Sequence, residues 1–139
     1  MLAVFLIPGA HPSKFALWIA ASLVLAGALN GCSSSKHPAA VSVEDYLQAL
    51  VNKNEARLVS LTCDSYEAAA LLEYDAFSLV KTRLEGLDCQ AGPASGNQAA
   101  VTCQGQIIAT YGNEDQQFDL SERTYQVTNE GGEWLVCGP

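Results

Sequence analysis

An uncharged run near the start of the chain limits what the remaining residues can fold into. The run extends from Phe15 to Leu29, follows Lys14 and ends shortly before Cys32. A helix needs about 20 apolar residues to span a membrane, whereas the apolar core of a secretory signal peptide has roughly 7–15. The run is therefore typical of a cleavable signal peptide. Removal of residues 1–31 would leave 108 residues, enough for one small domain.

The residues that end this run suggest how the chain is processed. The motif Leu29-Asn30-Gly31-Cys32 resembles the lipobox of bacterial lipoproteins, although Asn30 stands where Ala, Ser or Thr is more usual. The resemblance implies a signal peptide at residues 1–31 and a palmitate-type lipid anchor on Cys32. The anchor would hold the protein to a membrane of the bacterial cell envelope, facing the periplasm or the exterior. An uncleaved membrane anchor, or a buried helix that carries a cysteine by chance, is the alternative.

The charge of the chain from Cys32 onward excludes one class of partner. This part carries all fifteen acidic residues but only six of the seven basic ones, a formal charge of about −9. Nucleic-acid-binding proteins need clustered Lys and Arg side chains to contact phosphates, and this chain has no such cluster. Anionic lipid headgroups would also repel the domain, so membrane attachment must come from the lipid.

Four cysteines remain once Cys32 is assigned to the anchor, and an even number in an oxidising compartment predicts two disulfides. Cys89 and Cys103 flank a turn signal at residues 91–97, so a hairpin would place them opposite each other. Cys63 and Cys137 would then form the second bridge. A zinc site is the rival interpretation, but the spacing contains no Cys-x-x-Cys pair and we predict no metal.

The residues after the anchor predict a tether and then helices. Residues 32–40 are rich in Ser and contain Pro, which is typical of a flexible tether, and a single domain follows at 41–139. Apolar residues at helical spacing predict a first helix from the N-cap Ser42 to Val51. Two further helices are expected at Glu55–Leu61 and Tyr66–Glu85, the latter closed by Gly86.

The spacing of apolar residues changes from 3.6 to 2 after Gly86, which predicts strands. Four are expected, at Leu87–Gln90, Ala99–Tyr111, Gln116–Thr128 and Glu133–Cys137, with a bend near Ser121–Arg123. The fold class is therefore α+β: two or three N-terminal helices packed on a curved four-stranded antiparallel meander sheet. The core between the long helix and the concave sheet face is expected to contain Leu72, Leu79, Val101, Ile107, Tyr125 and Trp134.

The order of the elements and two short segments resemble one fold family. The segments are residues 43–50 (VEDYLQAL) and 132–137 (GEWLVC), and the family is that of nuclear-transport-factor-2-like or cystatin-like domains. In this family a curved sheet wraps a long helix. The resemblance implies no single function, because members include isomerases, cyclases, dehydratases and non-catalytic binding modules.

The sequence contains few groups suited to catalysis. Its two histidines, His11 and His37, lie in the predicted signal and tether, and the sequence contains no phosphate-binding loop, HExxH motif or Ca²⁺ loop. We therefore predict no cofactor and no His-dependent site. One group of acidic residues could bind a cation weakly, but we interpret it as a solvated surface. The group comprises Glu114, Asp115, Asp119 and Glu122.

Two functions remain open at this point. The first is a non-catalytic binding or assembly module whose partner is an unknown envelope protein or a small ligand. The second is a small isomerase- or cyclase-like enzyme that uses an Asp–Tyr pair in an apolar cavity, as the fold family permits. A protease-inhibitor-like domain is a third possibility. The candidates for the Asp–Tyr pair are Tyr46, Tyr66, Tyr74, Tyr111 and Tyr125 with Asp75, Asp88 or Asp119.

Overall fold

A computed structural model describes residues 35–139, and these residues form three helices and five strands. The predicted signal peptide and Cys32 lie outside the described residues. None of the helices described is long and apolar enough to cross a membrane. The α+β class is confirmed, with five strands instead of four. The elements are α1 Pro38–Val51, α2 Glu55–Ser60, α3 Glu67–Ser78, β1 Lys81–Ala91, β2 Gln98–Tyr111, β3 Glu114–Asp119, the short 3₁₀ helix η1 Leu120–Glu122, β4 Thr124–Glu130 and β5 Glu133–Gly138.

The sheet is antiparallel and is built around the long strand β2. One edge of β2 pairs with β1, while the other pairs with β4 along its first half and with β3 along its second half. β5 then pairs with β4. The single strand predicted at Gln116–Thr128 is therefore two strands, and η1 separates them at the predicted bend. The bend keeps Phe118, Leu120, Tyr125 and Val127 against one core, as predicted.

A close approach between two backbones marks the irregular part of the β1–β2 pair. The register shifts between Glu85 and Asp88, where Gly86 has a φ of 65°. On β2, Gly105 has a φ of 99°, and a Cβ atom there would lie 2.5 Å from the carbonyl oxygen of Glu85. Only glycine fits this position without strain. The prediction that Gly86 caps a helix is therefore wrong; it belongs to a β-bulge.

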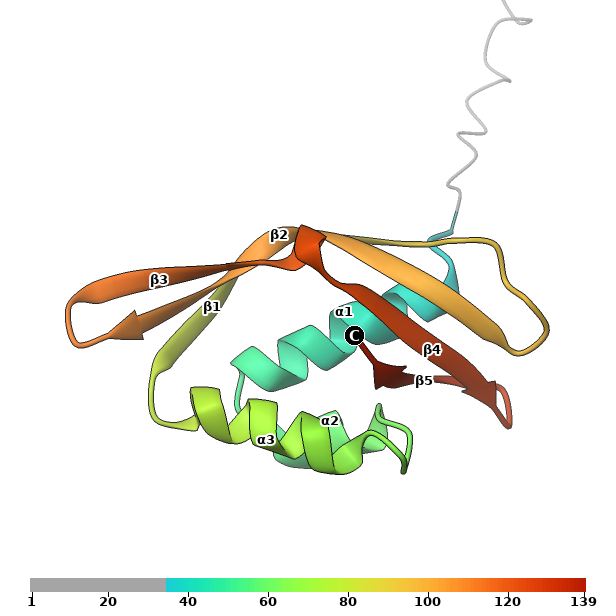
Figure 1. Ribbon diagram of the computed structural model, residues 1–139, viewed down its shortest axis with the longest axis horizontal. Helices are drawn as coiled ribbons and strands as arrows, with labels where there is room; N and C mark the ends of the chain where they lie inside the picture. The colour runs from blue at the N-terminus through green and yellow to red at the C-terminus, as the bar shows by residue number, and fades with distance from the viewer. Residues whose placement is uncertain (1–34) are drawn as a thin grey trace, which may run out of the picture. The chain divides into compact units, whose positions relative to one another are not determined.

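The helix beneath the curved sheet is α1, with α2 and α3 on its far side (Figure 1). The predicted apolar face of α1 is confirmed, because it is buried: Val43, Tyr46, Leu47 and Leu50 have no exposed surface and Val51 is 7% exposed. The helix begins at Pro38, four residues before the predicted N-cap. The last three residues of the predicted tether are consequently helical. The helix starts earlier than predicted because Ala39 and Ala40 are buried in the core and pack there as part of α1.

The third helix is shorter than predicted and less buried. α3 ends at Ser78, and β1 begins at Lys81. The predicted helix at Tyr66–Glu85 therefore exists but is too long, and the predicted strand at Leu87–Gln90 is only the second half of β1. Leu72 and Leu79, expected in the core, are 72% and 96% exposed. The buried side chains of α3 are Ala70 and Phe77.

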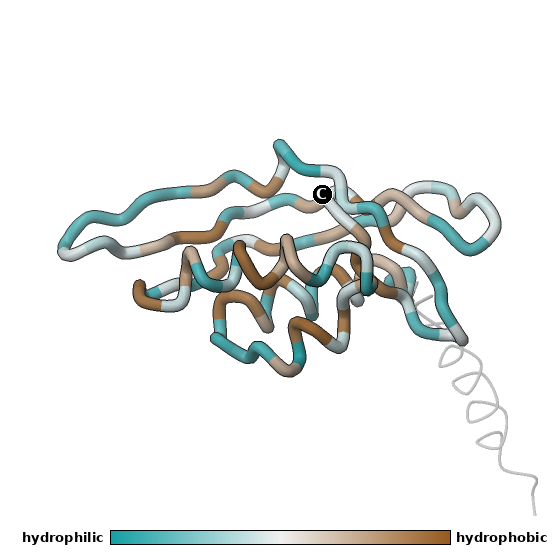
Figure 2. The backbone as a smooth tube through the Cα atoms, turned by 60° about the horizontal axis from the view of Figure 1, so that its bottom comes forward, coloured by the Kyte–Doolittle hydropathy of each residue, from teal (hydrophilic) through white to brown (hydrophobic). Residues whose placement is uncertain are grey.

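Other segments of the described chain cover the sheet edges at β1 and β5. The carboxylate of Glu44 on α1 accepts a hydrogen bond of 2.8 Å from the backbone N–H of Cys89. At the other edge, the backbone of β5 bonds to Leu61 and Cys63 through Val136, with distances of 2.8 and 2.9 Å. The edge strand β3 is instead mostly polar and is largely hydrophilic in Figure 2. Acidic side chains on an edge strand disfavour pairing with another sheet.

Candidate functional site

A carboxylate lies inside the domain, between three elements that are distant in the sequence. Glu73 on α3 accepts a hydrogen bond of 3.0 Å from the hydroxyl of Tyr46 on α1. It also accepts one of 2.6 Å from the guanidinium of Arg123, just before β4. The side chain of Glu73 is 15% exposed and that of Arg123 is 37% exposed. A buried carboxylate needs such partners, so the pair joins α3 to the sheet.

The protonation of this cluster follows from burial and from the two charges. Burial, followed by the charge of Glu73, raises the pKa of Tyr46 far above its usual value and raises the pKa of Tyr66 in the same direction. Burial is the largest single effect on Arg123 and disfavours its charged form, but the hydrogen bond to Glu73, the charge of Glu73 and the interactions with Tyr125 together outweigh it and raise the pKa of Arg123. Both tyrosines are therefore neutral hydrogen-bonding groups at physiological pH, and Arg123 is charged.

The hydroxyl of Tyr125 is the exception within the cluster. Tyr125 is fully buried, its ring lies 6.4 Å from that of Tyr46, and its hydroxyl has no hydrogen-bond partner among the described residues. Burial raises the pKa of Tyr125 to about 12. An unpaired buried hydroxyl destabilises the folded state, typically by about 1–3 kcal/mol.

A pocket of about 340 Å³ opens beside this cluster, between α3, β2 and the β3–η1 segment. Arg123 lines it together with the apolar side chains of Phe77, Ile107 and Phe118. The rings of Phe77 and Phe118 meet edge to face at 5.4 Å and form one wall. Tyr46 and Tyr125 do not line this pocket, and neither side chain has exposed surface, so both are enclosed by the core behind Arg123.

Within residues 35–139 no hydrogen bond joins a candidate aspartate to a candidate tyrosine, because the three aspartates have other surroundings. Asp88 bonds to Lys36 at 2.7 Å, and Asp119 caps the backbone N–H of Ser121 at 2.8 Å. Asp75 is exposed on α3. Three of the candidate tyrosines, Tyr46, Tyr66 and Tyr125, instead lie around Glu73 and Arg123, which sequence reasoning missed. Tyr74 donates a hydrogen bond of 3.2 Å to the carbonyl of Lys53, and Tyr111 is 39% exposed. A signal was present: Glu73 shares a helical face with Tyr66, Ala70 and Phe77, and a carboxylate on an apolar face needs a buried partner.

The remaining predicted site residues fall into three groups. Cys89 lies beside Cys103 and Cys63 beside Cys137, with Cα–Cα distances of 4.0 and 5.0 Å, so both predicted pairs are at disulfide distance. The predicted anchor, Cys32, lies outside the described residues. The acidic group on β3 and η1 is dispersed, and no three potential metal ligands gather anywhere within residues 35–139.

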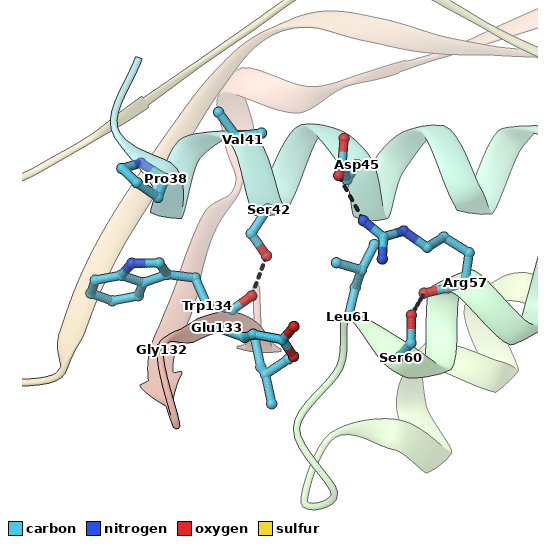
Figure 3. A pocket seen from close by; sticks show the side chains of 11 residues that line it. Pro38, Val41, Ser42, Asp45, Arg57, Ser60, Leu61, Gly132, Glu133 and Trp134 are labelled. Carbon is cyan, nitrogen blue, oxygen red and sulfur yellow. Dashed lines mark hydrogen bonds and ion pairs between the residues drawn. The ribbon is translucent and has the colours of Figure 1, made fainter. Parts of the chain in front are cut away.

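A second hollow lies along the first two turns of α1. This groove of about 220 Å³ runs between α1, the end of α2 and the β4–β5 turn, as Figure 3 shows. Ser42 forms part of its floor and donates a hydrogen bond of 2.5 Å to the carbonyl of Trp134. Its rim contains the ion pair between Asp45 and Arg57, 2.9 Å apart. The groove combines an indole and aliphatic surface with carboxylates.

His37, predicted to lie in a flexible tether, instead contacts Trp134 and the start of α1. Its Nδ1 accepts a hydrogen bond of 3.1 Å from the backbone N–H of Ala39 and so caps α1. Its ring also meets Trp134 edge to face at 5.6 Å. These contacts give His37 a structural role at the helix start.

Comparisons with known proteins identify the fold. No protein-family model and no curated protein matches the sequence. A structure from Shewanella frigidimarina, named as a candidate ketosteroid isomerase, is 16% identical with a TM-score of 0.52 and covers 72% of this chain and 90% of its own. A candidate scytalone dehydratase from Novosphingobium aromaticivorans is 16% identical (TM-score 0.48; 69% and 74% covered). A nuclear-transport-factor-2-like protein of unknown function from Pseudomonas putida is 13% identical (TM-score 0.44; 69% and 77% covered). The first likeness shows the fold, which is nuclear-transport-factor-2-like.

Proposed function

We propose that this chain is a lipid-anchored protein of a bacterial cell envelope whose folded domain is a non-catalytic binding or assembly module. The observation that carries the proposal is the packed interior of the cone. Tyr46, Leu50 and Tyr125 have no exposed surface, and Ile107 is 1% exposed. Enzyme sites are usually concave pockets with a few convergent polar groups. Here the polar groups inside the cone bond mainly to one another, which directs recognition to the surface.

Two sequence features support the envelope location. The run before Cys32 has the length of a signal-peptide core, and both remaining cysteine pairs lie at disulfide distance, as expected in an oxidising compartment. Pro38, the first residue of α1, follows Cys32 by six positions. Six extended residues span at most about 22 Å, so a lipid on Cys32 would keep the domain near the membrane surface.

A cavity-filling ligand tests whether the interior is closed. Benzene binds dry apolar cavities in proteins and stabilises the folded state in proportion to its occupancy. We expect saturating benzene to leave the melting temperature of the unaltered chain unchanged. The Leu50→Ala variant, which opens a cavity in the core away from the pocket at Phe77, is the positive control and should be stabilised. Stabilisation of the unaltered chain by benzene would contradict a closed cone.

An enzyme on the same scaffold is the second candidate, and one observation favours it. Within the described part of the chain, the Tyr125 hydroxyl has no hydrogen-bond partner, and it lies beside a tyrosine–carboxylate contact formed by Tyr46 and Glu73. An isomerase- or cyclase-like reaction would need an apolar substrate to reach these groups. Benzene binding to the unaltered chain, lost when Val101→Phe fills the cone, would favour this candidate over the binding module.

A further inference from the structure

The groove of Figure 3 has one apolar side and one acidic group without a charged partner. Trp134 lies at one end and is half-buried, with Pro38 and the 40% exposed Val41 next to it. The carboxylate of Glu133 lies between Trp134 and Leu61. Glu133 is exposed and forms no ion pair among the described residues. The groove therefore offers an aromatic face beside a free negative charge.

The charges around the groove determine whether its ligand should be positively or negatively charged. Asp45 and Arg57 neutralise each other across its rim, which leaves Glu133 as the net charge of the lining. Four of the six basic residues in the described part of the chain already pair with carboxylates. The surface as a whole is strongly acidic, so its field attracts cationic segments and repels anionic ones. The ligand chemistry that fits is cationic.

We propose that this groove binds an extended, basic peptide segment of an envelope protein. The aliphatic stem of a Lys or Arg side chain would pack on the indole of Trp134, and its charge would pair with Glu133. A neighbouring apolar side chain of the peptide would contact Pro38 and Val41. The proposal deepens the binding-module function and relies on it for the location of the partner. Because Pro38 lies so near Cys32 in the sequence, such a segment would be bound close to the membrane.

The position of Trp134 makes the test direct. The sequence contains two tryptophans, so the full chain with Trp18→Phe carries a single indole, inside the groove. This protein, in a non-ionic detergent at low salt, is titrated with a blocked pentapeptide that has one leucine between two lysines. We expect a saturable change in tryptophan emission. The same peptide with norleucine in place of lysine keeps the aliphatic stems without the charges, and we expect it to bind at least about tenfold more weakly.

Two variants separate recognition in the groove from general attraction. Glu133→Gln removes the proposed partner of the lysine and should weaken binding about fivefold, the equivalent of one partly exposed ion pair. Glu122→Gln removes the same formal charge beside the other pocket and should change affinity less than twofold. Equal losses in the two variants, equal binding of the norleucine peptide, or no change in emission would each overturn the proposal.

The peptide titration tests the groove and the lipidation of Cys32 tests the envelope location, so either proposal can fail without the other. Lysine-peptide binding by a chain that cells do not lipidate at Cys32 would support the groove and contradict the location. A lipidated chain that fails the peptide titration would contradict the groove alone.

Discussion

Two substitutions to alanine locate the core of the domain. Ile107 on β2 is 1% exposed and packs in the main cluster, whereas Leu72 on α3 is 72% exposed. Removing a buried aliphatic side chain costs about 2–5 kcal/mol, because transfer energy is lost and a cavity is left. A small domain has a free energy of unfolding of roughly 5–15 kcal/mol, so Ile107→Ala removes a large fraction of it.

The expected shifts in melting temperature follow from these values. For a domain of about 100 residues, 1 kcal/mol corresponds to about 4–8 °C, so Ile107→Ala should lower the midpoint by roughly 10–30 °C. Leu72→Ala should change stability by less than about 0.5 kcal/mol, since Leu72 loses little contact and alanine favours helix. Thermal unfolding followed by circular dichroism measures both, with the exposed Gln104→Ala as a further control.

A comparable loss of stability in the two variants would refute this placement of the core. It would mean that Leu72 packs against the sheet, as in the long helix that the sequence alone predicts. The position of α1 as the central helix would then be wrong.

Three further predictions concern the backbone and the buried tyrosines. Gly105→Ala should lower the free energy of unfolding by about 1–3 kcal/mol or more, because the new Cβ would meet the Glu85 carbonyl. Gly112→Ala, at a position with a positive φ but no neighbour within 4 Å, should lower it less. Chemical denaturation of the two variants measures the difference. Tyr125→Phe should raise the free energy of unfolding by about 1 kcal/mol, because it removes an unpaired buried hydroxyl; a loss measured by the same denaturation would show that the hydroxyl is bonded. The free energy of unfolding should fall as pH rises above about 10. Tyr46 and Tyr125 have raised pKa values in the folded chain and ordinary values in the unfolded chain, so above pH 10 they lose their protons only on unfolding. A flat profile of unfolding free energy between pH 9 and 11 would contradict this.

The sequence predicted the elements whose apolar pattern has one interpretation. The spacing of Val43, Tyr46, Leu47 and Leu50 fits only a helix, and α1 buries that face. The broken alternation near Ser121–Arg123 required a bend, and η1 lies there. The turn signal between Cys89 and Cys103 fixed a hairpin register, and these residues are direct partners across β1 and β2.

The prediction failed where one pattern fits two structures. Leu79, Val80 and Leu84 continue the helical spacing of α3, but residues 81–85 also alternate as a strand does. Pairing with the second half of β2 decides between them, since Lys81 aligns with Thr110 and Leu84 with Ile107. This contact between distant segments is absent from any local window, and it overrides helix propensity.

The candidate sites were also predicted unevenly. Cysteine spacing was sufficient to predict both pairs that lie at disulfide distance. The contact of Glu73 with Tyr46 and Arg123 could not be predicted, because it depends on how α1, α3 and β4 meet in space. The groove at Trp134 likewise arises from the packing of the β4–β5 turn against α1, which the sequence does not specify locally.

The intact mass of the protein extracted from the membranes of its host tests the lipid anchor most directly. We predict a chain that begins at Cys32, carries acyl groups on that residue and has its other four cysteines oxidised. The Cys32→Ser variant should keep its signal peptide and carry no lipid. An unmodified mass of the full 139-residue chain in membranes, or acylation that persists in Cys32→Ser, would contradict the account.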